Sequence, residues 1–162
     1  YSYRITGIGS DLPHNMKPNY IYEFDAGIST FKLNKFIGGG IKSFRFNCPK
    51  RKITNRERTT CNMHPHNYYL EILTETGLIG FIIVILIFIQ IIYLTFYKKY
   101  LSGSKLKFDN TIIPFIFLFI AEIFPLKSTG SFFTTNNATL LFLIIAILIG
   151  LVNRNNLIEN KK

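Results

Sequence analysis

Charged side chains are missing from residues 76–97, a run of 22 positions in a chain of 162 residues. Within this run, residues 78–97 are almost wholly apolar or aromatic. About 20 consecutive apolar residues are enough for a helix to cross the hydrocarbon core of a bilayer. The absence of charge therefore excludes an ordinary soluble domain and predicts a transmembrane helix at residues 78–97.

Acidic residues are scarce as well, with 9 Asp and Glu against 19 Lys and Arg, which gives a net charge of +10. A basic excess of this size is compatible with nucleic-acid binding. Seven of the basic residues, however, lie in the short segments 98–110 and 154–162, next to apolar stretches. Most of the others lie in residues 1–77, where anionic lipid head groups or a phosphorylated substrate are the expected partners. We therefore expect membrane lipids as partners, and no nucleic acid.

Two further apolar segments, residues 111–126 and 138–153, predict additional transmembrane helices. The first is interrupted only by Glu122 and two prolines. A buried core helix is the alternative for each segment, because both are shorter than a bilayer requires. Together the segments predict an all-α polytopic membrane protein, with about three transmembrane helices preceded by a loop domain that contains short helices.

Basic residues predict the orientation of these spans. Segment 98–110 contains four lysines and the tail 154–162 contains three basic residues, whereas the turn at residues 127–137 contains only Lys127. Basic residues in short loops stay in the cytoplasm. We therefore expect residues 1–77 and the turn 127–137 to face outward, and the other two segments to be cytoplasmic.

The sequence opens in polar residues, without an initiator methionine or a signal peptide. A segment that faces outward needs a preceding segment to carry it across the membrane. We expect the chain to be the carboxy-terminal part of a longer polytopic protein.

Cysteine is rare, and both cysteines, Cys48 and Cys61, lie in the outward-facing segment. In an oxidising compartment such a pair commonly forms a disulfide. A disulfide that closes a loop of this length would stabilise the fold by roughly 3 kcal/mol in the chain-entropy model. The loop between the cysteines is strongly basic and contains Arg51, Arg56 and Arg58. Arginine's planar fork suits a diphosphate, although a solvated surface is the plainer interpretation.

Cys61, His64 and His66 also have a spacing that a zinc site can use. A fourth ligand is not obvious, although His14 and Glu71 are candidates. A disulfide would remove Cys61 from such a site. We therefore expect no metal site.

A histidine-bearing segment leads into the first span. Pro65 and Asn67 are typical of a helix start, and Gly77 is typical of a helix end or a bend. The imidazoles of His64 and His66 therefore lie close to the membrane surface, and histidine is suited to moving a proton near neutral pH. A purely structural role is the alternative for both histidines.

A glycine triplet at residues 38–40 precedes this segment. It is a weak indication of a phosphate-binding loop, because it lacks a Walker lysine and the strand-to-helix context. A simple turn explains it equally well.

The pattern His66-Asn67, nine residues, Gly77, two residues and Gly80 resembles the signature of the O-antigen ligase and polymerase family. These are bacterial inner-membrane glycan transferases that use lipid-carrier substrates. Residues 34–45 are similar to the glycine-rich stretch that precedes the histidine in this family, and residues 124–137 resemble its late periplasmic turn. Ile83 stands where the longer ligase pattern has a third glycine, which favours a polymerase over a ligase.

The resemblance implies an inverting glycan transfer in the periplasm that needs neither metal nor cofactor. The donor would be a glycan on undecaprenyl diphosphate, and the acceptor a lipid A core or a growing lipid-linked glycan. His66 would act as general base, an effect typically worth 10²–10⁴-fold, with Asn67 orienting or capping. The diphosphate-binding candidates are Arg45 first, then Arg51, Arg56, Arg58 and His64.

The competing hypothesis is a non-catalytic polytopic membrane protein. It would be a transporter portion, or a glycan-binding or metal-binding subunit, with structural histidines. Glu122 fits either hypothesis, because ionisable groups within spans are often functional. Near the outer end of its span, Glu122 could equally extend to the interface with Lys127 as its partner, if the helix continues that far.

Overall fold

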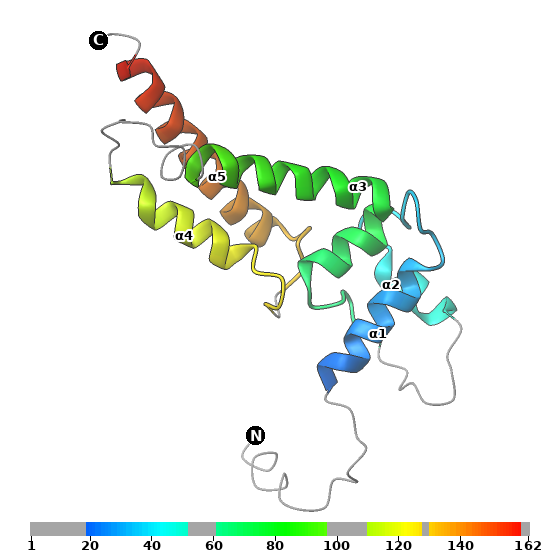
Figure 1. The fold of residues 1–162 in the computed structure, drawn as a ribbon. Helices are drawn as coiled ribbons and strands as arrows, with labels where there is room; N and C mark the ends of the chain where they lie inside the picture. Colours follow the sequence, from blue (N-terminus) through cyan, green and yellow to red (C-terminus); the bar gives the residue numbers. More distant parts are fainter. Residues whose placement is uncertain (1–18, 52–60, 97–109, 128–129, 160–162) are drawn as a thin grey trace, which may run out of the picture.

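The computed structural model describes residues 19–51, 61–96, 110–127 and 130–159. In these residues every regular element is a helix, which confirms the predicted all-α class (Figure 1). The elements are α1 (Asn19–Phe31), α2 (Phe44–Asn47), the 3-10 turn η2 (Cys48–Lys50), α3 (Tyr68–Ile92), α4 (Ile112–Glu122) and α5 (Thr135–Glu159).

Two helices are long and apolar enough to cross a membrane. The helical run that contains α3 extends over Tyr68–Phe96, 29 residues, and that of α5 over Thr135–Arg154, 20 residues. Only 17% of the most apolar window of each helix is buried within the chain. Large side chains such as Leu86 and Phe142 remain exposed on their outer faces. Such faces suit contact with lipid, and the chain is accordingly a helical membrane protein.

The second of the three predicted spans is shorter than the sequence predicted. The span predicted at residues 111–126 is the helix α4, Ile112–Glu122, with 11 residues. At about 1.5 Å per residue it covers roughly half of the hydrocarbon thickness. In the described residues there are therefore two helices of spanning length and one shorter apolar helix. Pro125 explains the early end, because proline disfavours helical backbone at the residue before it and lacks an N–H.

The boundaries of the two long helices also differ from the prediction. α3 begins at Tyr68, ten residues before the predicted span, and α5 covers Thr135–Glu159 rather than residues 138–153. α3 is two helices joined at Gly77, whose backbone is not helical. Figure 1 shows the short first part of α3 meeting its long second part at a sharp bend. The histidine motif and the apolar span therefore belong to one interrupted element.

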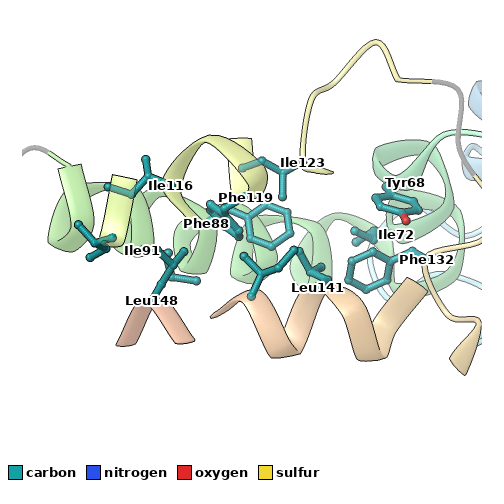
Figure 2. Packing of buried hydrophobic residues seen from close by; sticks show 12 residues of the cluster. Tyr68, Ile72, Phe88, Ile91, Ile116, Phe119, Ile123, Phe132, Leu141 and Leu148 are labelled. Atoms are coloured by element: carbon teal, nitrogen blue, oxygen red, sulfur yellow. The ribbon is translucent and has the colours of Figure 1, made fainter. Parts of the chain in front are cut away.

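The main core lies between α3, α4 and α5 (Figure 2). Phe88 of α3 and Phe119 of α4 meet edge to face, with their ring centroids 5.7 Å apart. Tyr68 and Phe132 make a similar contact at 5.4 Å. This geometry contributes about 0.5–1.5 kcal/mol for each pair beyond burial. The core thus extends from the first part of α3 into the apolar second part and fixes the position of each part relative to the other.

A second, smaller core holds α1 against the first part of α3. It contains Ala26, Phe44 and Cys48, each at most 2% exposed. At Gly27 the backbone of α1 comes so close to Leu70 that an added Cβ would lie 3.0 Å from the leucine Cδ1. Residues 19–51 therefore pack as a cover over the part of α3 that follows the histidines.

Candidate functional site

The break in α3 at Gly77 leaves two backbone donors without helical partners. In a continuous helix, Leu78 and Ile79 would donate to the carbonyls four positions earlier. Instead the Leu78 N–H donates to the Lys35 carbonyl at 2.8 Å, and the Ile79 N–H donates to the Phe36 carbonyl at 3.2 Å. The chain before the glycine triplet therefore supplies the acceptors that the second part of α3 needs.

The two carbonyls on the other side of the break are paired by the glycine triplet itself. Thr74 O accepts from the Gly39 N–H at 3.0 Å, and Glu75 O accepts from the Gly40 N–H at 2.9 Å. Unpaired backbone groups are costly when buried, so these bonds stabilise the break. The N–H groups of a phosphate-binding loop must be free, and these two are already used. The triplet closes the helix break.

Glu75 joins the same loop through its side chain. Its Oε2 accepts from the Lys42 N–H at 2.6 Å, and Lys42 has a left-handed backbone with φ 61°. Glu75 lies before the break and outside the charge-free span, and it is only 2% exposed. Burial raises the pKa of Glu75 to about 7, against the bond from Lys42, and the neighbouring Glu71 raises it further.

Asn67 caps the first part of α3. Its Oδ1 accepts from the N–H groups of Tyr69 and Leu70, at 3.0 and 3.1 Å, and its Nδ2 donates to the Pro125 carbonyl at 2.7 Å. The side chain is buried and all of its polar atoms are used. Of the two roles expected from the sequence, orienting and capping, the structure shows capping. The bond from Nδ2 to Pro125 also connects the segment that contains the histidines to the turn after α4.

His66 precedes this cap and has a left-handed backbone, with φ 51°. Such a conformation is uncommon for residues other than glycine and recurs at functional sites. Its ring lies 4.3 Å from that of His64, centroid to centroid. Burial lowers the pKa of His64, the nearby His66 lowers it further, and Glu23 opposes both. His64 is therefore held in its neutral form around pH 7.

Two cavities flank the histidine pair. The larger, of about 560 Å³, has His66 in its wall and is otherwise mostly apolar. Its other lining residues are Ile21, Glu23, Phe24, Pro65, Leu126 and Lys127. A mostly apolar cavity with a few polar groups is typical of a binding site for an organic ligand.

The smaller cavity, of about 170 Å³, brings Arg45 together with His64. Its remaining lining comes from Lys42, Met63, Glu71, Glu75, Ser131 and Thr134. Arg45 is exposed, with its guanidinium 4.9 Å from the centroid of the Phe46 ring. Of the two candidate arginines that the structure describes, Arg45 and Arg51, it is Arg45 that lies beside a histidine.

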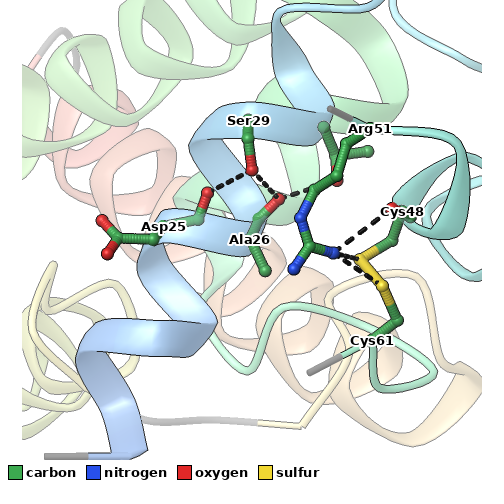
Figure 3. Close-up of a disulfide and its surroundings, with 7 residues drawn as sticks. Asp25, Ala26, Ser29, Cys48, Arg51 and Cys61 are labelled. Carbon is green, nitrogen blue, oxygen red and sulfur yellow. Dashed lines mark hydrogen bonds between the residues drawn. A yellow bond between two sulfur atoms is a disulfide. The ribbon is translucent and has the colours of Figure 1, made fainter. Parts of the chain in front are cut away.

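Arg51 is placed differently. It is only 4% exposed, and its guanidinium donates to the Cys48 carbonyl and contacts both sulfurs of the Cys48–Cys61 disulfide (Figure 3). A guanidinium buried against a disulfide does not suit the diphosphate-binding role expected for Arg51. Arg56 and Arg58 lie outside the described residues.

Cys61 is not available as the zinc ligand that the spacing of Cys61, His64 and His66 suggested. Cys61 is bonded to Cys48, with the two Cα atoms 5.8 Å apart. His14 lies outside the described residues. In the part of the chain that the structure describes, no three His, Cys, Asp or Glu side chains are grouped to hold a metal ion.

Glu71 has a role that the sequence did not suggest. Its carboxylate accepts from the Ser131 hydroxyl and from the Phe132 N–H, both at 2.5 Å, and Glu71 is only 1% exposed. Glu71 therefore holds the segment before α5 against the first part of α3. The available signal was a carboxylate four residues from Glu75 on one helix face, with no basic partner on that helix.

Glu122 pairs with Lys127, as the sequence suggested, although the helix does not continue as far as Lys127. Its Oε2 lies 2.6 Å from the Lys127 Nζ, and its Oε1 accepts from the Tyr68 hydroxyl at 2.9 Å. The helix ends at Glu122, so the ion pair forms across the following turn. The Tyr69 hydroxyl donates to the Ile123 carbonyl beside it. These contacts hold the end of α4 against the start of α3.

Residues 5–85 match the family model described as O-antigen ligase, and this is half of the 162-residue chain. The chain belongs to the O-antigen ligase family. The match includes the glycine triplet, the histidine motif and the start of the span, and ends before α4 and α5. The likeness of residues 124–137 to the family's late turn therefore stays a prediction. No curated protein and no solved structure matches the chain significantly.

Membership of the O-antigen ligase family brings a membrane setting and lipid-linked glycan substrates. It also brings glycosyltransferase activity of the ligase or polymerase type. The matched region contains the helix break, both histidines and Arg45. The region that the family model matches thus includes the part of the chain that the loop and the disulfide hold together.

Proposed function

We propose that the protein transfers a glycan from undecaprenyl diphosphate to a lipid A core or to a growing lipid-linked glycan. It does so as a multi-pass protein of the bacterial inner membrane, with the histidine motif facing the periplasm. His66 is the general base and Arg45 binds the diphosphate. The reaction inverts the anomeric centre and uses neither metal nor cofactor.

The position of His66 is the observation that carries this proposal. The residue is held in a left-handed conformation between buried Pro65 and the capping Asn67, and it lines a cavity of about 560 Å³. Backbone strain of this kind persists only where the surroundings enforce it. A base fixed at a cavity wall can meet a bound hydroxyl without first losing its own mobility.

The chemistry assigns each group one task. The His66 imidazole accepts the proton of the acceptor hydroxyl while that oxygen forms a bond to the anomeric carbon of the donor. The bond from that carbon to the diphosphate oxygen breaks, and undecaprenyl diphosphate leaves with the electron pair. Negative charge gathers on the leaving group, and fixed cations stabilise it.

The smaller cavity supports the role of Arg45. Arg45 and Lys42 both line it and both are exposed, so their charges are available to a ligand. Arginine's planar fork matches a diphosphate in two places at once. His64, which is held neutral, lines the same cavity, and its ring lies 4.3 Å from that of His66, centroid to centroid. Donor and acceptor would therefore meet across the histidine pair, with the diphosphate on the Arg45 side.

The test is a transfer assay with the complete protein in vesicles, fluorescent undecaprenyl-diphosphate glycan as donor and an unlabelled lipid-linked glycan or lipid A core as acceptor. The proposal predicts a new glycosidic bond and free undecaprenyl diphosphate, with or without a chelator. Arg45→Ala should raise the donor KM more than Arg45→Lys does. Asn136→Ala, at an exposed site in the first turn of α5 and outside both cavities, is the matched control. Movement of the donor across the bilayer without a new bond would instead support a transporter, and chelator-sensitive transfer would contradict the metal-independent mechanism.

A further inference from the structure

Four large apolar side chains stand out from the chain around the glycine triplet. Phe36, Ile37, Ile41 and Phe46 are between 62% and 80% exposed. We refer to these four residues as the loop patch. A cluster of exposed apolar side chains of this size is unusual unless it has a partner.

The charged neighbours of the loop patch along the chain are all basic. Between Ala26 and Lys50 there are five basic residues and no acidic one. All five are exposed: Lys32, Lys35, Lys42, Arg45 and Lys50. We refer to these five residues as the basic rim. Apolar side chains whose charged neighbours along the chain are all basic complement a surface that is apolar inside and negatively charged at its edge, which is the character of an anionic bilayer interface.

The position of the loop patch is fixed relative to the apolar span. The carbonyls of Lys35 and Phe36 accept from Leu78 and Ile79, the first residues of the span. The side chains of Leu78 and Ile79 are themselves 41% and 56% exposed. The loop patch therefore continues the exposed apolar face of α3 at the end where the helix meets the bilayer surface.

We infer that the loop patch inserts into the interface of the bilayer that α3 crosses, with the basic rim on lipid phosphates. Insertion holds Arg45 at head-group depth, the depth at which the diphosphate of a lipid carrier lies. The inference concerns membrane contact alone and does not require His66 to be a base.

The membrane is favoured over a protein partner by continuity and by charge. An apolar partner helix would cover Ile37 and Ile41 but would supply no counter-charge to the exposed cations. The bilayer supplies both kinds of contact to one surface. Coverage by another protein segment is the outcome that the experiment must distinguish.

The test places an environment-sensitive fluorophore at Ile37→Cys in the complete protein, reconstituted in vesicles. The two cysteines of this chain are bonded to each other, so the introduced thiol can be labelled selectively. Asn62→Cys, an exposed polar site in the same segment, is the matched control, and Leu86→Cys reports the bilayer interior. Shallow nitroxide lipids and aqueous iodide serve as quenchers.

We expect the Ile37 label to emit at shorter wavelength than the Asn62 label, with strong quenching by shallow nitroxide lipid and weak quenching by iodide. Quenching by iodide as strong as at Asn62 would overturn the inference. Protection from both quenchers would also overturn it, because a protein segment would then cover the loop patch.

A second measurement tests the basic rim. In the labelled protein, nitroxide quenching should be stronger in vesicles with phosphatidylglycerol than in phosphatidylcholine alone. The double substitution Lys32→Glu and Lys35→Glu should remove that difference. Equal quenching of the unsubstituted protein in both lipids would contradict a role for the cations. Because neither readout is glycan transfer, failure here leaves the proposed function untouched.

Discussion

Gly38 and Gly77 approach each other so closely that neither position has room for a side chain. A Cβ on Gly77 would lie 2.5 Å from the Gly38 nitrogen, and a Cβ on Gly38 would lie 2.5 Å from the Gly77 nitrogen. Both have left-handed backbones, with φ of 77° and 68°. This contact gives a reason for the nine residues between Asn67 and Gly77. The helix that Asn67 caps must extend as far as the break at Gly77, where the glycine-triplet loop pairs with its backbone.

The first prediction concerns that contact. Gly38→Ala and Gly77→Ala should each destabilise the protein by more than the 1–3 kcal/mol typical of a strained backbone alone, because steric overlap adds to it. The melting temperature of the purified protein in detergent should fall, and glycan transfer should fall with it.

The matched control for both variants is Gly150→Ala in α5. Its added Cβ would meet nothing within 4 Å. Alanine is favoured over glycine in a helix by about 1 kcal/mol, so this variant should be neutral or slightly stabilised. A Gly77→Ala protein that melts with the wild type would show that the loop does not close the break as described.

The second prediction separates the two tasks of Asn67. Asn67→Ala removes the cap, worth about 0.5–2 kcal/mol, and also the bond to the Pro125 carbonyl. Asn67→Ser keeps a neutral cap acceptor and loses the amide that donates to Pro125. Thermal unfolding should therefore rank the wild type first, the serine variant second and the alanine variant last. Equal melting of the two variants would mean that the cap contributes nothing.

The third prediction concerns the Cys48–Cys61 disulfide. Cys61 is exposed, so a reductant can reach the bond. Reduction should destabilise the fold by roughly 2–5 kcal/mol, partly because Arg51 loses its packing partner. Melting with and without reductant measures the effect. A variant with both cysteines changed to serine must be insensitive to reductant, and an unchanged wild-type melting temperature would contradict the prediction.

The fourth prediction concerns pH and Glu75. Its pKa is raised to about 7 in the folded protein from an ordinary value of 4.5. A raised folded pKa stabilises the fold fully below the unfolded pKa, and this contribution is lost as pH rises through the folded pKa. Stability should thus fall between about pH 4.5 and 7. Glu75→Gln stays neutral and still accepts from Lys42, so its melting temperature should change less over that range. Identical pH profiles would exclude Glu75 as the source.

Local features of the sequence predicted local structure well. Asn67 indicated the helix start because asparagine is strongly preferred as a helix cap, whereas Pro65 lies two residues before the cap and not in the first turn of the helix. The absence of charge in residues 76–97 predicted the apolar helix for an equally simple reason. The disulfide between the only two cysteines could also be expected. Each of these features depends on residue type and near neighbours.

The rest depends on contacts between distant segments, which residue types do not specify. Nothing in the glycine triplet shows that Gly39 and Gly40 donate to Thr74 and Glu75, 35 residues further along. The burial of Arg51 likewise follows from the position of the disulfide after folding. Residue types alone indicate an exposed loop in both places, because polar and glycine-rich segments usually form exposed loops.

The proposed mechanism requires the His66 imidazole, so the rate of glycan transfer by His66→Ala decides whether His66 is the base. The assay uses complete protein in vesicles and saturating labelled undecaprenyl-diphosphate glycan, with the wild type and Asn136→Ala measured in parallel. A positioned general base contributes 10²–10⁴-fold, so the variant should transfer at least about 100-fold more slowly at an unchanged melting temperature. Transfer by His66→Ala at the wild-type rate would contradict the assignment of His66 as the base.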